Sequence, residues 1–388
     1  MTGTADVVIV GGGVTGVSIA FQLAGLGVRR VVLLERRFLA SGGTGRSVGI
    51  VRQLYPTPET TTMVRRSLDV FQRFDEVVGG DAGYVACGVL IGVSPAMRPA
   101  LQANLAMQRG LGVRADLLEP DDVARVEPEI DAAGLGAALW EPDSGYGDPT
   151  AVTLAYAGAA RRRGVTIEQG IEVTGLRGAG TRVTGVDTSH GAVEAPVVVN
   201  AAGLWSPRIA RLGGVELPIV VGRHPVFVIE RGVTVPRHRV YLDLAGGSYA
   251  RPETGALTLT GSLTDDETEH PMDPELLGAE PGFEEASAVL ERTGRAMPRL
   301  ADARYRSGYA GAFDITPDWM PILDETGPAG FFTAAGMSGH GFKLAPAVGE
   351  FMAALITGGT PAVSAAAFRL DRFASVAKGG TFVASYLR

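Results

Sequence analysis

The strongest constraint on the fold lies in the first 35 residues. An uncharged, β-branched run at 7–10 is followed at once by the pattern Gly-x-Gly-x-x-Gly at 11–16. Apolar residues then recur with helical spacing over 14–26, and a second apolar run ends at Glu35, 24 residues after Gly11. The order strand, glycine turn, helix, strand and acidic residue predicts a dinucleotide-binding βαβ unit.

Each part of this pattern has a physical reason. Gly11 permits the tight turn, Gly13 lets a pyrophosphate approach the backbone, and Gly16 lets the helix pack closely on the strand. The helix N-terminus then faces the phosphates. Glu35 would accept a hydrogen bond from a ribose hydroxyl and would repel a 2′-phosphate, which disfavours NADP. No second pattern of this kind is framed by a strand and a helix, so we expect a single dinucleotide.

The uncharged stretch 7–28 raises the alternative of a membrane span or a signal peptide. Asp6 stands where a signal peptide carries a basic residue, and the glycines at 11–13 interrupt the stretch. Arg29 and Arg30 then lead into another β-branched run instead of a cleavage site. We therefore predict no membrane association and a cytoplasmic protein.

Charge and cysteine content exclude several other classes. The net charge of −7 argues against a protein that binds nucleic acid or anionic membranes. A single cysteine, Cys87, excludes an internal disulfide framework, and the five histidines lack the spacing of metal ligands, so no metal is predicted. Only Lys343 and Lys378 are lysines among the 35 basic residues, which draws attention to both.

Two segments after the second strand could contact a ligand. The hydroxyl-rich loop 41–47 could wrap a pyrophosphate with its backbone amides, its hydroxyls and Arg46, and an ordinary surface loop is the alternative. Arg52 follows among apolar neighbours. A guanidinium in such company is either a ligand anchor suited to a carboxylate or a partner in a structural ion pair.

A similar arrangement recurs near the C-terminus. A short apolar run at 331–334 is followed by a glycine-rich turn at 336–341 and by helical apolar spacing over 342–356. The turn and the helix N-terminus again suit a negatively charged group. Residues 197–201 read as a further buried strand, after which Gly203 lets the chain turn close to a ligand.

Four further segments carry a family resemblance. They are Gly-Asp-Pro at 147–149 before a helix that ends near 163, Val-Val-Asn-Ala-Ala-Gly-Leu-Trp-Ser at 198–206, Thr-Pro-Asp at 316–318, and Gly-Met-Ser-Gly-His-Gly-Phe-Lys at 336–343. Together they resemble the D-amino-acid oxidase superfamily of flavoproteins. The resemblance is closest to the branch of sarcosine oxidases and dimethylglycine dehydrogenases.

The resemblance implies FAD and an amine or amino-acid substrate. In the sarcosine oxidase branch, the residues matching Arg52 and Lys343 bind the substrate carboxylate. His340 is either a catalytic residue or a ring packed beside the cofactor, and Tyr249, Arg251 and Trp319 are candidates for the pocket wall, with plain packing as the alternative. The residues expected to bind the cofactor are Gly11, Gly13, Val14, Thr15, Gly16, Glu35, Arg36, Ser41, Thr44, Arg46, Ser47, Val173, Ala202, Gly203, Trp205, Gly311, Gly339, His340, Gly341, Phe342 and Lys343.

Three departures from the family narrow the expectation. Gly311 stands where monomeric sarcosine oxidases carry the cysteine that bonds covalently to FAD, and Cys87 lies elsewhere in the sequence, so we expect non-covalent FAD. Phe313 replaces the arginine with which glycine and D-amino-acid oxidases bind a carboxylate, which favours Arg52 and Lys343 in that role. The segment 257–265 lacks the lysine that speeds the reaction with oxygen in monomeric sarcosine oxidases, which puts O2 as acceptor in doubt.

The expected fold class is α/β. A discontinuous Rossmann-like FAD-binding domain of the GR2 type is expected to comprise 1–84, 148–216 and 307–388. An inserted α+β substrate domain comprises 85–147 and 217–306 and is built on an antiparallel sheet. Strand-like runs lie at 225–230, 239–244 and 256–261, and the acidic segment 265–285 is interpreted as a surface excursion.

The expected reaction is oxidation of a C–N bond in a secondary or tertiary amine or amino acid. The substrate is sarcosine-like, N-methylated or a cyclic imino acid, and hydride passes to flavin N5 to give an imine. O2 is the expected acceptor, with H2O2 as product. The alternatives are a dehydrogenase that passes electrons to a protein, and a flavin-binding subunit of a hetero-oligomeric complex. Self-association is compatible with these features.

Overall fold

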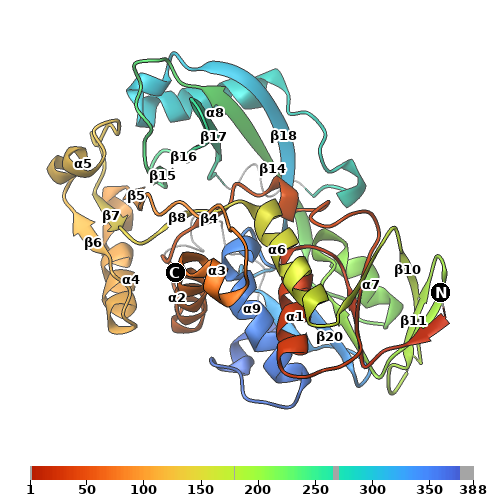
Figure 1. The fold of residues 1–388 in the computed structure, drawn as a ribbon. Coiled ribbons are helices and arrows are strands. Elements are labelled where there is room, and N and C mark those ends of the chain that lie inside the picture. Colours follow the sequence, from red (N-terminus) through yellow and green to blue (C-terminus); the bar gives the residue numbers. More distant parts are fainter. Residues whose placement is uncertain (1, 179, 265–270, 376–388) are drawn as a thin grey trace.

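The computed structural model describes residues 2–178, 180–264 and 271–375 (Figure 1). Lys378, the end of the last predicted segment and the first residues of the predicted surface excursion lie outside this range. The chain forms two main sheets, one of six strands and one of eight, and helices pack against both of them (Figure 1). Among the described residues, no helix combines the length and the apolar character needed to cross a membrane.

The first main sheet has six strands in the order β19-β20-β13-β2-β3-β9. Its strands run parallel except for β19, which pairs antiparallel with β20. The chain therefore places strands from both ends of the sequence side by side. The bounds are β2 Val7–Val10, β3 Val31–Glu35, β9 Thr166–Gln169, β13 Val197–Asn200, β19 Ile322–Glu325 and β20 Phe331–Ala335.

Both faces of this sheet are covered, which explains why its central strands β2, β13 and β20 are buried at almost every position. Val7 and Ile9 of β2 pack into the helix layer, whereas Val8 and Val10 pack against the opposite face. The helix layer consists of α1 (Val14–Gly25), α6 (Pro149–Arg162), α9 (Gly341–Ile356) and α2 (Pro58–Gln72). The opposite face carries α7 (Ser206–Leu212) and the sheet β1-β12-β11-β10, with bounds Thr2–Thr4, Gly191–Glu194, Gly185–Thr188 and Val173–Arg177.

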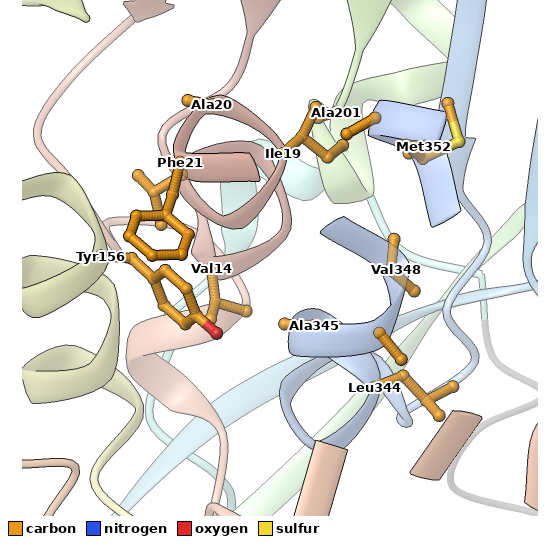
Figure 2. Packing of buried hydrophobic residues seen from close by; sticks show 14 of the residues in the cluster. Val14, Ile19, Ala20, Phe21, Tyr156, Ala201, Leu344, Ala345, Val348 and Met352 are labelled. Atoms are coloured by element: carbon orange, nitrogen blue, oxygen red, sulfur yellow. The ribbon is translucent and has the colours of Figure 1, made fainter. Parts of the chain in front are cut away.

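Helix α1 lies between α6 and α9, and Figure 2 shows this packing. On one side, Phe21 meets Tyr156 of α6 edge-on, with ring centroids 5.3 Å apart. On the other side, Ile19 is directed toward the α9 side chains Val348 and Met352 (Figure 2). The helix that begins at the first glycine turn is thus held against the helix that begins at the second.

The second main sheet has eight strands in the order β18-β14-β17-β16-β15-β5-β7-β6. Neighbouring strands pair antiparallel except β15 and β5, so the predicted antiparallel sheet is confirmed apart from one parallel pair. The bounds are β5 Val89–Val93, β6 Asp116–Leu118, β7 Ala137–Glu141, β14 Val220–Glu230, β15 Val240–Asp243, β16 Ser248–Pro252, β17 Leu257–Ser262 and β18 Arg304–Ile315. The three strand-like runs identified in the sequence lie in β14, β15 and β17.

Helices flank this second sheet, namely α4 (Arg98–Gly110), α5 (Pro120–Val126) and α8 (Phe283–Ala296). Leu90 and Tyr241 pack toward α5 and the end of α8, while Leu242 and Tyr249 belong to the opposite face. A small ladder between β4 (Ile50–Val51) and β8 (Gly145–Tyr146) joins the two parts of the molecule. The predicted domain boundary at 306/307 falls inside β18, and the domain limits stay a prediction.

Candidate active site and cofactor cavity

A cavity of about 510 Å³ lies between the two main sheets. It is lined at one end by the glycine turn after β2, and elsewhere by the turn after β20 and by side chains of β14, β15 and β16. Both turns follow the carboxyl ends of parallel strands, and in the sheet only β13 separates β2 from β20. This is the edge at which open α/β sheets bind their ligands, and the volume is in the usual range for cofactor and small-molecule sites.

The first glycine turn has no room for side chains. Gly11 has a φ of 115°, and a Cβ built there would lie 2.4 Å from the carbonyl oxygen of Ala201. A Cβ on Gly16 would lie 2.0 Å from the carbonyl oxygen of Gly11, so turn and helix are in direct backbone contact. Gly11, Gly13, Val14 and Thr15 line the cavity, while Gly16 lies behind them. The turn therefore presents backbone to the cavity, as a pyrophosphate site requires.

The Glu35 carboxylate lines the cavity and accepts two backbone hydrogen bonds. Its Oε2 accepts the N–H of Gly12 at 2.7 Å, and its Oε1 accepts the N–H of Arg37 at 2.7 Å. The carboxylate lines the cavity, and each oxygen retains lone-pair capacity beyond one backbone bond. This geometry fits the predicted contact with ribose hydroxyls.

The loop 41–47 lines the cavity with Ser41, Thr44, Arg46 and Ser47 and is not a plain surface loop. Thr44 Oγ1 accepts the N–H of Val14 at 3.2 Å, which ties the loop to the start of α1. Arg46 donates to the carbonyl oxygens of Ser41 at 2.6 Å and Gly42 at 3.2 Å. Part of the Arg46 guanidinium therefore braces its own loop, and the remaining N–H groups are available to an anion.

The cavity wall next to Arg36 depends on two residues, Arg208 and Glu275, that the sequence did not reveal. Val173, Ala202, Gly203 and Trp205 line the cavity as predicted, and Arg208 joins them. Glu275, from the segment interpreted as a surface excursion, accepts hydrogen bonds from Trp205 Nε1 at 2.7 Å and from Arg36 and Arg208 at 2.9 Å each. The Arg36 guanidinium also lies 4.9 Å from the centroid of the Trp205 ring. One carboxylate thus joins three cavity-lining side chains.

The Glu275 network predicts a measurable effect on cofactor retention. The hydrogen bond from Arg36, supported by Trp205 and Arg208, lowers the pKa of Glu275 to about 2. Its stabilising contribution is complete above the ordinary carboxyl pKa of 4.5 and is lost as the pH falls toward that folded value. We expect Glu275→Gln to speed FAD release from the holoprotein roughly 3- to 10-fold, because two partially exposed ion pairs and the hydrogen bond from Trp205 are weakened together.

Stopped-flow flavin fluorescence after dilution would measure this release. Glu216→Gln, which disrupts an exposed pair with Arg211 outside the cavity lining, serves as the matched control. High salt should speed release from the wild type toward the Glu275→Gln rate, since exposed pairs are screened. Equal release rates for the two variants would contradict the assignment.

The second glycine turn is shaped by left-handed backbone at Gly336, Ser338 and Gly339, with φ of 70°, 48° and 78°. Gly339, Gly341, Phe342 and Lys343 line the cavity together with Gly311. His340 does not belong to the lining: its buried ring meets Tyr55 edge-on, with centroids 5.0 Å apart. This placement favours the packing alternative for His340.

Two cations, Arg52 and Lys343, face the cavity side by side. Arg52 is 1% exposed and donates to the carbonyl oxygen of Leu54, while Lys343 is 7% exposed and donates to the carbonyl oxygen of Gly339 at 3.3 Å. Burial, and the Arg52 charge beside it, hold the pKa of the Lys343 ammonium well below its ordinary value. An anion bound between them would relieve this repulsion and favour the charged form of Lys343.

A cluster of rings that lines the same cavity includes one residue that the sequence did not reveal. His224 on β14 stacks on Phe313, with ring centroids 4.4 Å apart, and its Nε2 lies 3.4 Å from the hydroxyl of Tyr249. Burial lowers the pKa of His224 to about 4, so its imidazole is neutral at neutral pH. The residues around His224 in the sequence form no motif that would predict its place in the cavity.

Two of the predicted wall residues lie elsewhere. Arg251 donates to the carbonyl oxygen of Val48 at 2.8 Å and pairs with Glu253 at 2.6 Å, outside the cavity lining. Trp319 is buried in the hydrophobic cluster that contains the second-sheet residues Leu242 and Tyr249. For both residues the structure favours the packing alternative, whereas Tyr249 does line the cavity.

Comparisons with known proteins agree with this geometry. The model of the family described as "DAO: FAD dependent oxidoreductase" matches residues 6–355. The 4-methylaminobutanoate oxidase (formaldehyde-forming) of Paenarthrobacter nicotinovorans is 32% identical over 375 residues, which are 94% of this chain and 45% of that protein. The sarcosine oxidase subunit beta of Rhizobium meliloti is 32% identical over 375 residues, which are 95% of this chain and 88% of that protein.

Among solved structures, L-proline dehydrogenase from P. horikoshii matches with a TM-score of 0.88 and 26% identity. The match covers 96% of this chain and 99% of that chain. The chain thus spans nearly the whole of this structure and of the subunit beta, but less than half of the length of the 4-methylaminobutanoate oxidase.

Proposed function

The chain belongs to the DAO family of FAD-dependent oxidoreductases, and from that premise we propose that it oxidises the C–N bond of a carboxylated secondary or tertiary amine to an imine. The family match confirms the resemblance, the α/β flavoprotein fold and the FAD dependence predicted from the sequence. The observation that carries the proposed substrate class is the pair of buried cations, Arg52 and Lys343, in the cavity that the second glycine turn also lines.

The choice of amine is supported by the names of the relatives. A 4-methylaminobutanoate oxidase and a sarcosine oxidase subunit imply N-methyl amino acids as substrates of those proteins, and L-proline dehydrogenase implies a cyclic imino acid. All three substrates pair a carboxylate with a secondary amine. We propose a substrate of the same chemistry here, with the carboxylate between Arg52 and Lys343.

The cavity has the parts to hold the cofactor without a covalent bond. Backbone at 11–15, the Glu35 carboxylate and the loop 41–47 would hold the dinucleotide part, and the turn at 339–343 would hold the flavin. Gly311 lines the cavity without a nucleophilic side chain, and Cys87 is not part of the lining. When bound, FAD supplies the acceptor for the hydride.

The protein orients the substrate and excludes water from the reaction site. Arg52 and Lys343 fix the carboxylate and so direct the adjacent C–H, because two cations define the orientation of one anion. Leu242, Leu263 and Val226 line the same cavity and limit water. The neutral His224 ring and the Tyr249 hydroxyl can accept or donate a hydrogen bond at the amine without adding a positive charge that would repel it.

O2 is the proposed electron acceptor, with H2O2 as product, and a protein acceptor is the second candidate. The specific observation that favours the second candidate is the lysine content: in the described ranges, Lys343 is the one lysine, and none lies on β17. The subunit-beta relative also supports a place in a hetero-oligomeric complex as an alternative setting. A cytoplasmic location stays a prediction from the sequence.

A visible spectrum of the purified protein, followed by anaerobic titration, tests the proposal. We expect flavin absorbance that is released by denaturation, and bleaching of that absorbance by sarcosine, another N-methyl amino acid or proline. Dimethylamine, which lacks the carboxylate, serves as the control. Peroxide formation in air would identify an oxidase, whereas dye reduction without peroxide would identify the dehydrogenase. A protein without flavin absorbance would contradict the whole proposal.

A further inference from the structure

Asp314 is a buried carboxyl group to which the proposed reaction assigns no role. It lies near the end of β18, is 7% exposed and lines the cavity. Its Oδ2 accepts the N–H of Gly336 at 2.8 Å, and its backbone carbonyl accepts the N–H of Ser338 at 3.0 Å. The glycine turn that leads into α9 is therefore tied to this one residue through two of its backbone N–H groups.

The surroundings of Asp314 bring the ionisation of its carboxyl group close to neutral pH. Burial raises its pKa to about 6, although the backbone N–H groups of Met337 and Gly336 favour the ionised form. His224, on the neighbouring strand β14, is neutral above mildly acidic pH. Lys343 on α9 and Arg52 after β4 line the same cavity, as do Arg36, Arg37, Arg46 and Arg208. Asp314 is thus mostly ionised at neutral pH and mostly neutral in mild acid.

The N-terminus of α9 and the Asp314 carboxylate act in opposite directions on a negative charge. A helix N-terminus stabilises an anion that develops in front of it, whereas a buried carboxylate close to the same turn destabilises that anion. A flavin gains negative charge when it accepts a hydride. The net effect on the bound flavin therefore depends on whether Asp314 carries its charge.

Building on the proposed function, we infer that the Asp314 carboxylate lowers the midpoint potential of the bound flavin by placing a negative charge behind the turn that opens α9. The hydride from the substrate carries two electrons and one proton, and Asp314 takes up a further proton from solvent as the cofactor becomes negative. Asp314 is a positioning residue in this proposal, because it acts through the turn and through its charge.

The test is Asp314→Asn, which removes the charge and keeps one acceptor for the N–H of Gly336. The readouts are the affinity of the oxidised holoprotein for sulfite, which bleaches flavin absorbance, and the midpoint potential measured against a reference dye. We expect sulfite to bind roughly tenfold more tightly, and the same factor corresponds to a potential higher by about 30 mV. In the wild type, the potential should bend with pH around the pKa of Asp314, and this inflection should vanish in the variant.

Two further variants separate charge from structure. Asp318→Asn is the matched control, because Asp318 follows closely in sequence, pairs with Arg372 at 2.8 Å and lies outside the cavity lining. It should leave the sulfite affinity and the potential unchanged. Asp314→Glu retains the charge and should retain the inflection.

Unchanged sulfite affinity and potential in flavin-loaded Asp314→Asn would overturn the inference. If that variant does not retain flavin, the wild-type protein and Asp314→Glu decide, since the absence of a pH inflection in both would overturn it equally. A wild-type protein without bound flavin is a different result, because it contradicts the proposed function itself.

Discussion

Arg52→Met is expected to raise the KM for a carboxylated amine by one to two orders of magnitude. The guanidinium is almost fully buried and faces the cavity next to Lys343. Losing one charge-assisted contact to a carboxylate costs about 1.5–3 kcal/mol, which corresponds to that range. Methionine replaces the aliphatic stem of the arginine and removes its charge, so the apolar packing around that stem is largely preserved.

Steady-state kinetics with sarcosine and with dimethylamine would measure the effect. The KM for sarcosine should rise, while oxidation of dimethylamine, which has no carboxylate, should change little. Arg66→Met is the matched control, because Arg66 forms an exposed pair with Glu350 outside the cavity lining. An equal loss for both amines would show that Arg52 supports the cavity wall and does not bind the carboxylate.

Gly16→Ala is expected to abolish FAD binding. The new methyl group would lie 2.0 Å from the carbonyl oxygen of Gly11 and 3.5 Å from a side-chain carbon of Ile9. The backbone oxygen cannot move without opening the turn, so α1 would be pushed away from β2 and the phosphate site would lose its shape. Overpacking of this kind typically costs about 1–3 kcal/mol or more in stability.

The ratio of flavin absorbance to protein absorbance after purification would report the loss, and thermal unfolding would report the stability. Gly110→Ala is the control, because a Cβ at the end of α4 would meet no atom within 4 Å. It should retain a full complement of flavin. A Gly16→Ala protein that purifies with wild-type flavin content would refute the close contact between turn and helix.

The parts of the site that depend on a local pattern could be predicted from the sequence. The glycine turn before α1, the acidic residue at the end of β3 and the glycine turn before α9 each lie within one strand–turn–helix unit, so their spacing is visible in the chain. Arg52 and Lys343 also stood out, because one is a charge among apolar residues and the other is a rare residue type. The structure brings both of them to one cavity.

The sequence did not reveal roles that depend on partners far apart in the chain. Glu275 looked like one acid in a polar surface segment, and its importance arises only because Trp205, Arg36 and Arg208 meet it in space. His224 became a candidate only when Phe313 and Tyr249 were found against it. Such contacts depend on sheet register and on the packing of the two parts of the molecule, which no local window of sequence contains.

The strand order of the six-stranded sheet has a consequence for biosynthesis. A ribosome releases the first glycine turn more than 300 residues before β20 and α9, which complete the same cavity. The central strand β2 cannot pair with β13 or pack beneath α9 until those segments have been made. A nascent chain therefore cannot complete this cavity until α9 has been made, and until then its apolar strands depend on other protection in the cell.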